Sequence, residues 1–255
     1  MLKLAISDRV ALLTLENPPA NTFTAAGLLQ LQQCVHDLDR NPEVSAIVVT
    51  GAGEKFFSAG ADLKTFAADD FPQAHVMAQR FGAAFGALQE ARAVVIAAIN
   101  GYAMGGGLEC ALACDVRVAE EHAQMALPEP AVGLLPCGCG TQTLPWLVGE
   151  GWAKRMILTN QRIDAATALR IGLVEEVVGR GESLATALAI AKRVAQLSPD
   201  AVASSKQLIH LARQAVPRSA ALAMEREKFM ALFDSDNRRE GVNAFLEKRQ
   251  PQWQY

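Results

Sequence analysis

The sequence has no excess of positive charge. Its 255 residues include 24 Lys and Arg against 27 Asp and Glu, which gives a formal net charge of -3 at pH 7. Proteins dedicated to nucleic acids usually have a basic surplus that neutralises phosphates. We therefore expect no nucleic-acid partner, although a local basic patch could still bind a small phosphorylated ligand.

Long apolar runs are absent as well. The most strongly apolar stretch, Val94–Ile99, is far shorter than the ~20 residues that a membrane-spanning helix needs. The first residues, Met1–Ser7, have the alternating pattern of a strand and not the pattern of a secretory signal. We expect no membrane partner and a cytoplasmic location.

Cysteine and histidine are few and are not arranged as metal ligands. No C-x-x-C pair occurs, and no His stands at metal-ligand spacing beside a Cys. Reduced thiols and no metal site are the simplest interpretation. No Ser-His-Asp set can be assembled for a serine hydrolase either. The residues concerned are Cys34, Cys110, Cys114, Cys137 and Cys139, with His36, His75, His122 and His210.

What the chain does contain is enough apolar sequence for a large core, since 51% of its residues are hydrophobic. Its first half alternates strand patterns with helix patterns, which predicts an α/β fold with a largely parallel sheet covered on both faces. Strands are expected at 2–7, 10–16, 45–50, 94–99, 115–119 and 123–127, and helices from Thr24 to about residue 38, at 71–90 and at 105–114.

The second half is dominated by helical patterns. From Thr141 onward Ala, Leu, Arg and Glu prevail, with one strand-like break at Leu173–Val178. We expect a core domain at 1–195 and a C-terminal helical region at 196–255. The latter is too thin to form its own core and should pack on the core domain or on a neighbouring subunit. Its expected helices are 201–214, 220–233 and 238–248.

Two glycine-containing turns follow buried strands. They are Phe57–Asp62 and Asn100–Glu109, and the second contains Gly105-Gly106-Gly107 at the start of a predicted helix. Such turns let backbone amides point outward, and amides at a helix start favour negative charge. Two converging amides would form an oxyanion hole for a carbonyl that becomes enolate-like. The alternative is a pair of ordinary strand-to-helix turns. Dinucleotide binding fits badly, because the G-x-G-x-x-G spacing is missing, and there is no P-loop.

These turns resemble those of the enoyl-CoA hydratase/isomerase family, also called the crotonase superfamily. Further matching stretches are Val94–Glu109, Ala126–Glu129, Gly140–Gln142, Ala165–Val178 and 240–249. The resemblance implies a crotonase (ClpP-like) fold of repeated β-β-α units, with a C-terminal helical trimerisation region and a homotrimer or a hexamer made of two trimers. It implies an acyl-CoA substrate, with coenzyme A entering as part of that substrate and no separate cofactor.

The resemblance also implies roles for individual residues. The amides of Ala61 and Gly106 would bind the thioester oxygen. The adenine and pantetheine would lie against one short segment, which consists of Ala59, Gly60, Ala61, Asp62 and Leu63. The phosphates would contact Lys55 and, from a neighbouring subunit, Lys248. The alternative for both lysines is that they are solvated surface charges. Other candidate substrate contacts are Phe66, Gly105, Pro128 and Cys137, with a helical stripe of Met77, Phe81, Phe85 and Leu88 that is either acyl pocket or plain core.

Two carboxylates match the catalytic glutamates of the hydratases. Glu109 lies on the first turn of the helix that Gly106 begins, and Glu129 stands between two prolines, which predicts a stiff, extended segment. Glu109 would deprotonate a water and Glu129 would protonate C2 of the enoyl thioester, one of them with a raised pKa. The expected activity is syn hydration of a trans-2-enoyl-CoA. The alternatives are 3,2-enoyl-CoA isomerisation with mainly one glutamate and, from another class, a non-catalytic or RNA-binding relative.

One position departs from the family pattern. The hydratases usually have Pro-Gly-x-Gly-Gly-Thr-Gln where this chain has Pro136-Cys137-Gly138-Cys139-Gly140-Thr141-Gln142. Cys137 keeps the backbone amide of that glycine but adds a side chain, so the water site could be smaller or drier. A reactive thiol in this loop is the remaining alternative.

Overall fold

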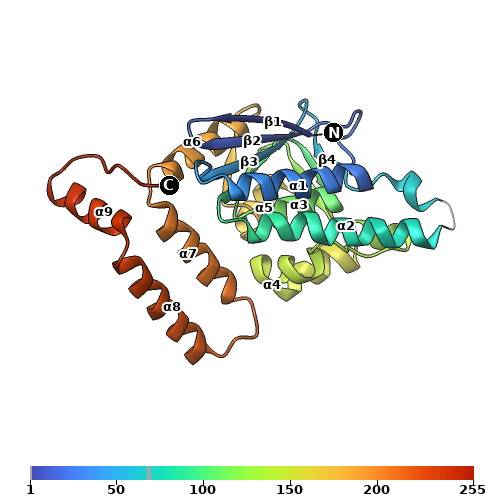
Figure 1. The fold of residues 1–255 in the computed structure, drawn as a ribbon. Coiled ribbons are helices and arrows are strands. Elements are labelled where there is room, and N and C mark those ends of the chain that lie inside the picture. Colours follow the sequence, from blue (N-terminus) through green and yellow to red (C-terminus); the bar gives the residue numbers. More distant parts are fainter. Residues whose placement is uncertain (1, 68–69) are drawn as a thin grey trace.

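The fold is built from a β-β-α unit that recurs along the chain. A computed structural model describes residues 2–67 and 70–255, and Figure 1 shows its arrangement. The crotonase-type repeat expected from the resemblance is present. Its four units are β1 (Leu2–Ser7), β2 (Val10–Leu15) and α1 (Ala25–Arg40); β3 (Ala46–Gly51), β4 (Phe56–Ser58) and α2 (Phe71–Glu90); β5 (Val94–Ile99), β6 (Tyr102–Met104) and α3 (Gly106–Leu112); and β7 (Val116–Glu120), β8 (Gln124–Ala126) and α4 (Gly140–Leu158).

The first strands of these units form the larger sheet. Its order is β1-β2-β3-β5-β7-β10, with β10 at Glu176–Val178. All neighbours are parallel except β1 and β2, which form the expected hairpin through Asp8 and Arg9. Both faces of the sheet are covered, because Val48 packs toward α6 (Ser183–Ala195) while Ile47 and Val49 belong to the main core. This two-sided burial explains the uninterrupted apolar runs in the sequence.

The second strands form a smaller sheet, which the sequence prediction missed in part. Its order is β4-β6-β8-β9, with β9 at Ile163–Asp164. The segments 57–62 and 100–109 were expected to be turns, but β4 and β6 occupy part of them. Strands of three residues are too short to show a reliable alternation. This short sheet carries the candidate site described below.

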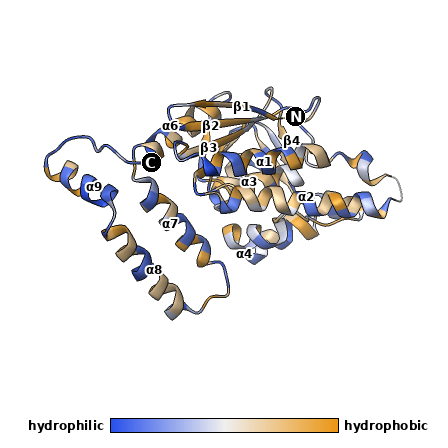
Figure 2. Ribbon diagram, in the orientation of Figure 1, coloured by the Kyte–Doolittle hydropathy of each residue, from blue (hydrophilic) through white to orange (hydrophobic). Residues whose placement is uncertain are grey.

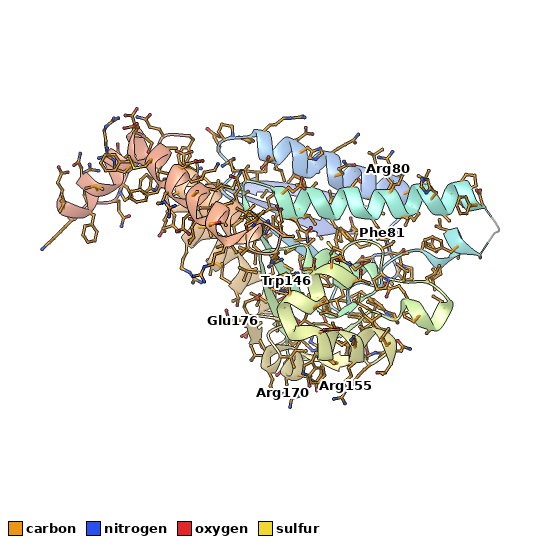
Figure 3. The ribbon with its side chains drawn as sticks, turned by 90° about the horizontal axis from the view of Figure 1, so that it is seen from below. Arg80, Phe81, Trp146, Arg155, Arg170 and Glu176 are labelled. Carbon is orange, nitrogen blue, oxygen red and sulfur yellow. The ribbon has the colours of Figure 1, made fainter. Side chains whose placement is uncertain are left out.

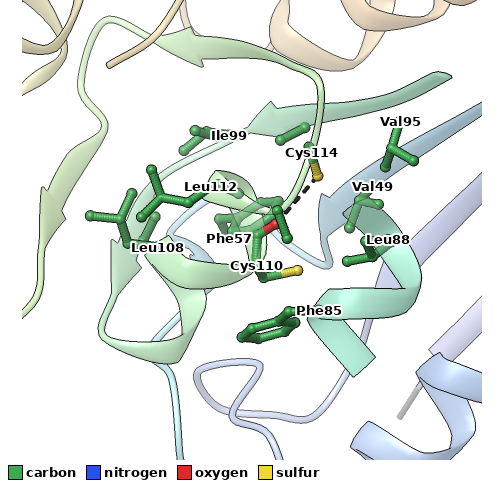
Figure 4. Packing of buried hydrophobic residues seen from close by; sticks show 14 of the residues in the cluster. Val49, Phe57, Phe85, Leu88, Val95, Ile99, Leu108, Cys110, Leu112 and Cys114 are labelled. Atoms are coloured by element: carbon green, nitrogen blue, oxygen red, sulfur yellow. Dashed lines mark hydrogen bonds between the residues drawn. The ribbon is translucent and has the colours of Figure 1, made fainter. Parts of the chain in front are cut away.

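The helices of the first half were predicted accurately. Thr24 caps α1 through its side chain, which accepts a hydrogen bond from the Gly27 amide. The stripe of Met77, Phe81, Phe85 and Leu88 on α2 is buried. Figure 4 shows Phe85 and Leu88 near the Cys110 side chain, with the Cys114 thiol on the other side of the Cys110 backbone. Cys110 and Cys114 are core residues as expected, and the Cys114 thiol donates to the Cys110 carbonyl.

The last helices extend away from the sheets (Figure 1). They are α7 (Pro199–Leu211), α8 (Arg218–Phe233) and α9 (Asp236–Leu246), preceded by the short α5 (Ala165–Arg170) and by α6. Helix α7 is attached to the larger sheet by Lys206, whose buried ammonium contacts the Ala93 carbonyl at 2.9 Å and the Asp115 carboxylate at 2.7 Å. The C-terminal residues return to the core, where the Trp253 indole donates to the Gln196 carbonyl. Within the described ranges no helix has both the length and the apolar character to cross a membrane.

Candidate active site

The candidate site lies at one edge of the smaller sheet. Strands β4, β6 and β8 are parallel, so their carboxyl ends meet at the same edge. Three turns leave from this edge: Ala59–Ala61 after β4, Gly105-Gly106 after β6, and Pro128-Glu129 just beyond β8. The sheet therefore brings together the two glycine turns and one of the two candidate acids.

The two candidate amides are free to bind a ligand. Ala61 forms a parallel bridge with Phe23. The hydrogen bonds of this bridge are made by the residues beside Ala61: the Gly60 carbonyl accepts from the Phe23 amide, and the Asp62 amide donates to the Phe23 carbonyl. Gly106 is the first residue of α3, where an amide has no intrahelical acceptor. Neither amide donates a hydrogen bond to another described residue. A Cβ added to Gly60 would lie 3.0 Å from the Gly106 nitrogen, so the two turns are in direct contact.

Gly105 shows why the second turn needs glycine. Its φ of +53° and ψ of -127° are conformations that residues with a side chain rarely adopt. A Cβ at this position would also lie 2.9 Å from the Glu129 Oε1 atom. The turn thus packs its backbone directly against the Glu129 carboxyl.

Glu109 is held by backbone amides at the start of another helix. Its Oε1 atom accepts hydrogen bonds from the amides of Gly138, Cys139 and Gly140, at 2.9, 2.9 and 2.8 Å. These amides form the N-terminus of α4, where Cys139 provides no side-chain cap. The carboxylate therefore caps α4, and the helix end in turn favours its negative charge. Burial raises the pKa of Glu109, whose residue is 2% exposed, and the three amides oppose that rise.

Glu129 is in a different environment. Contrary to the expectation of an extended segment, it begins a 3-10 turn at Glu129–Val132, which accommodates Pro130 in its first turn. Its Oε2 atom is buried without a hydrogen-bond partner among the described residues. Burial, with a smaller contribution from the charge of Glu109, raises the pKa of Glu129 to about 7. Near neutral pH Glu129 therefore retains much of its proton.

Both carboxyls face one largely apolar cavity of about 200 Å³. Phe81 forms part of its wall and projects from the side of α2 opposite Arg80 (Figure 3). A Cβ on Gly106 would lie 2.6 Å from the Phe81 ring, which shows how closely this ring covers the start of α3. The Phe81 ring is itself fixed by edge-on contact with Phe23, at 5.9 Å between centroids. Such a site can hold an apolar acyl group beside two acids and two free amides.

Comparison with known proteins agrees with this geometry. A family model described as Enoyl-CoA hydratase/isomerase matches residues 5–255.

The chain belongs to the enoyl-CoA hydratase/isomerase family. It is 38% identical to the short-chain-enoyl-CoA hydratase of Clostridium acetobutylicum over 94% of this chain and 92% of the relative. It is 39% identical to the 2,3-dehydroadipyl-CoA hydratase of Escherichia coli, over 96% and 94%. Among solved structures, Pseudomonas aeruginosa DspI is 60% identical, with a TM-score of 0.97 over 99% of this chain and 96% of the other. The family membership and the crotonase fold expected from the sequence are confirmed.

Within this family fold, most of the predicted site residues lie around the same cavity. The residues that line it and were expected at the site are Ala59, Ala61, Leu63, Phe66, Gly105, Gly106, Glu109, Pro128, Glu129 and Cys137. Gly60 and Asp62 belong to the adjoining turn without lining the cavity. Lys55 and Lys248 are exposed and do not line it either. The roles of all these residues remain predictions.

Sequence reasoning missed one wall of the cavity and the support of Glu109. Ala131, Val132, Leu134 and Leu135 line the cavity. The signal in the sequence is weak, because it consists only of apolar residues in a loop otherwise rich in glycine and proline. The hydrogen bonds from the amides at 138–140 could not be predicted in this way, because every residue except proline has a backbone amide and the residue type does not show where it points.

The thiol of Cys137 does not have the properties of a nucleophile. Partial burial and the charges of Glu109 and Glu129 raise its pKa to about 11. Since the thiolate is the reactive form, the reactive-thiol interpretation of this loop is disfavoured. No cluster of three or more His, Cys, Asp or Glu side chains in the described part of the chain could hold a metal ion.

Proposed function

We propose that this protein is an enoyl-CoA hydratase, which adds water reversibly to a trans-2-enoyl-CoA to give a 3-hydroxyacyl-CoA. One observation carries the proposal: two carboxyls with different backbone environments share an apolar cavity with two amides that have no acceptor among the described residues. Glu109 has three amide donors on one oxygen, and Glu129 has a pKa of about 7. This pairs a base with an acid in one site.

In the proposed mechanism, the amides of Ala61 and Gly106 bind the thioester oxygen and stabilise the enolate-like intermediate. A water between the carboxyls gives a proton to Glu109 while its oxygen bonds to C3. Glu129 gives its proton to C2. The water thus supplies the hydroxyl group, and proton transfer from Glu109 back to Glu129 restores the starting state. Both additions come from the side of the alkene that faces the carboxyls, which gives syn addition.

The test is the hydration of crotonyl-CoA by Glu109→Gln and Glu129→Gln, followed as the loss of the conjugated thioester absorbance. Glutamine keeps an oxygen that can accept the amide hydrogen bonds but does not exchange protons. Each variant should lose about 10²-fold or more in turnover, a typical size for general acid or base catalysis. Binding of a saturated acyl-CoA, measured by calorimetry, should survive in both variants.

The matched control is Glu90→Gln, at the exposed end of α2, which should be as active as the parent. Near-normal hydration by both active-site variants would overturn the proposal. If only one glutamate is required and a 3-enoyl-CoA gains the conjugated absorbance, the protein is a 3,2-enoyl-CoA isomerase. Salt-sensitive RNA binding at physiological ionic strength would support the third alternative.

We also propose a homotrimer or a dimer of trimers. Figure 2 shows apolar positions along α8 and α9, which extend away from the sheets. Their exposed side chains include Phe229 (65%), Met230 (59%), Phe245 (82%) and Leu246 (71%), an arrangement typical of an interaction surface. Light scattering after size-exclusion chromatography tests the oligomer. Lys248 of a neighbouring subunit as a phosphate contact and the absence of a cofactor are proposed on the family resemblance. A cytoplasmic location is proposed on the free cysteines.

A further inference from the structure

The cavity contains no partner for a second charge on the acyl group. Of the described residues that line it, only Glu109 and Glu129 are charged, and none is a cation. A carboxylate at the end of the acyl group would find no cation among these residues and could cover the apolar lining only by giving up its hydration. It would also meet the negative charge of Glu109 in a partly desolvated space.

One apolar wall of the cavity is connected to both carboxyls. If the thioester oxygen lies at the amides of Ala61 and Gly106, C2 and C3 lie at the carboxyls. Both carboxyls contact the segment 129–140. Glu129 is its first residue, and the three amides at its other end donate hydrogen bonds to Glu109. The wall formed by residues 131–137 is therefore within reach of carbons beyond C3.

That wall is aliphatic and open to solvent. Val132, Leu134 and Leu135 line the cavity while remaining 55%, 42% and 65% exposed. A two- to four-carbon acyl group would leave these side chains in water. A longer hydrocarbon chain would cover them and gain the free energy of burying apolar surface on both partners.

We propose, on the basis of the proposed function, that the substrate carries an uncharged hydrocarbon acyl chain whose distal carbons lie on Val132, Leu134 and Leu135, and that acyl groups ending in a carboxylate are rejected. This proposal depends on the residues that line the cavity and on its exposed aliphatic wall. It does not depend on which glutamate gives or takes a proton. The acyl specificity resides in the loop that follows Glu129.

The first experiment compares kcat/KM for trans-2-enoyl-CoAs of four, six and eight carbons with six- and eight-carbon analogues that end in a carboxylate. Each added methylene that reaches the wall should raise kcat/KM by about fourfold, the factor that corresponds to burying one CH₂ group. The analogue with a terminal carboxylate should be roughly tenfold poorer than the hydrocarbon of equal length, because its hydrated end group leaves part of the wall in water. Equal rates for the two types, or rates independent of chain length, would overturn the proposal.

The second experiment changes the wall. Leu135→Arg places a cation beside the distal carbons and should improve kcat/KM for the carboxylate analogue by at least tenfold while lowering it for the hydrocarbon. The control is Leu158→Arg, a leucine of similar exposure (71%) at the end of α4 and outside the cavity lining, which should change neither rate. An unchanged preference in Leu135→Arg would contradict the placement of the chain.

Binding separates this proposal from the proposed function. Saturated acyl-CoAs of the same lengths, with and without a terminal carboxylate, are titrated by calorimetry and require no turnover. A clear preference for the hydrocarbon series without any hydration would remove the hydratase proposal and support the specificity. Hydration of crotonyl-CoA with no such preference would support the hydratase and overturn the specificity.

Discussion

Replacing Glu129 by glutamine should remove the activity and, above neutral pH, make the protein more stable. Burial and the charge of Glu109 raise the pKa of Glu129 from 4.5 to about 7. Because each pKa unit corresponds to about 1.4 kcal/mol, the folded protein loses about 3 kcal/mol when it must hold Glu129 ionised. Glutamine has nearly the shape of the protonated acid and does not ionise.

The direction of the pH effect on stability follows from the protonation of Glu129 in the folded and unfolded chains. Below about pH 4.5 Glu129 is protonated in both folded and unfolded chains and contributes no difference. As pH rises from 4.5 to about 7, the unfolded chain loses this proton first, so the parent is progressively destabilised. Above about pH 7 the difference is complete. Glu129→Gln should therefore match the parent at about pH 4.5 and exceed it by about 3 kcal/mol at about pH 8.5.

Urea unfolding followed by circular dichroism measures this difference, with the free energy extrapolated to water for both proteins at both pH values. Titrating groups that do not interact with Glu129 act equally on parent and variant, so they cancel in the comparison. Glu90→Gln, at an exposed position, serves as the control and should show no pH-dependent gain. A difference between parent and Glu129→Gln that does not change with pH would refute the reasoning.

Three further predictions follow from particular contacts. If Glu129 must be protonated to act as the acid, kcat/KM should fall as pH rises through about 7, which a pH–rate profile checks. Gly105→Ala, which places a Cβ at positive φ and 2.9 Å from the Glu129 carboxyl, should lower turnover at least tenfold and cost roughly 1–3 kcal/mol of stability, measured by urea unfolding. Lys206→Met should cost about 3 kcal/mol in the same assay, because it removes the ammonium 2.7 Å from the largely buried Asp115 carboxylate and leaves only the His210 ring, at 3.6 Å, as an ion-pair partner among the described residues.

Much of the fold could be predicted from the sequence because its long elements have clear periodicity. The buried run at 94–99 and the apolar stripe of α2 each extend over enough residues to distinguish strand from helix. The smaller sheet could not be predicted in the same way. Strands β4 and β6 have three residues each, and their position depends on pairing with segments distant in the chain. Local pattern contains no information on such pairing.

The candidate site could be predicted where it depends on residue type and failed where it depends on the backbone. Glu109, Glu129 and the glycine turns match the residue types of the family pattern at the same spacing. The 3-10 turn at Glu129 was mistaken for an extended segment, because the effect of Pro130 on the preceding residue is a preference that the packing of the turn overrides. The aliphatic wall at 132–135 could not be predicted, because apolar residues in a loop have no periodicity that shows which surface they face.

The different environments of the two carboxyls come from the path of the chain and not from their residue type. Glu109 receives three amides because α4 begins beside α3, and this approach depends on a loop without bulk. A Cβ on Gly138 would lie 2.5 Å from the Phe85 ring and 3.1 Å from Oε2 of Glu109. A side chain there would push the amides away from the carboxylate and remove what opposes the effect of burial on its pKa. With the amides withdrawn, burial would raise the pKa of Glu109 without opposition, and the environments of the two carboxyls would become more alike. The absence of a side chain at Gly138 therefore allows the approach of α4 that opposes the effect of burial on the pKa of Glu109.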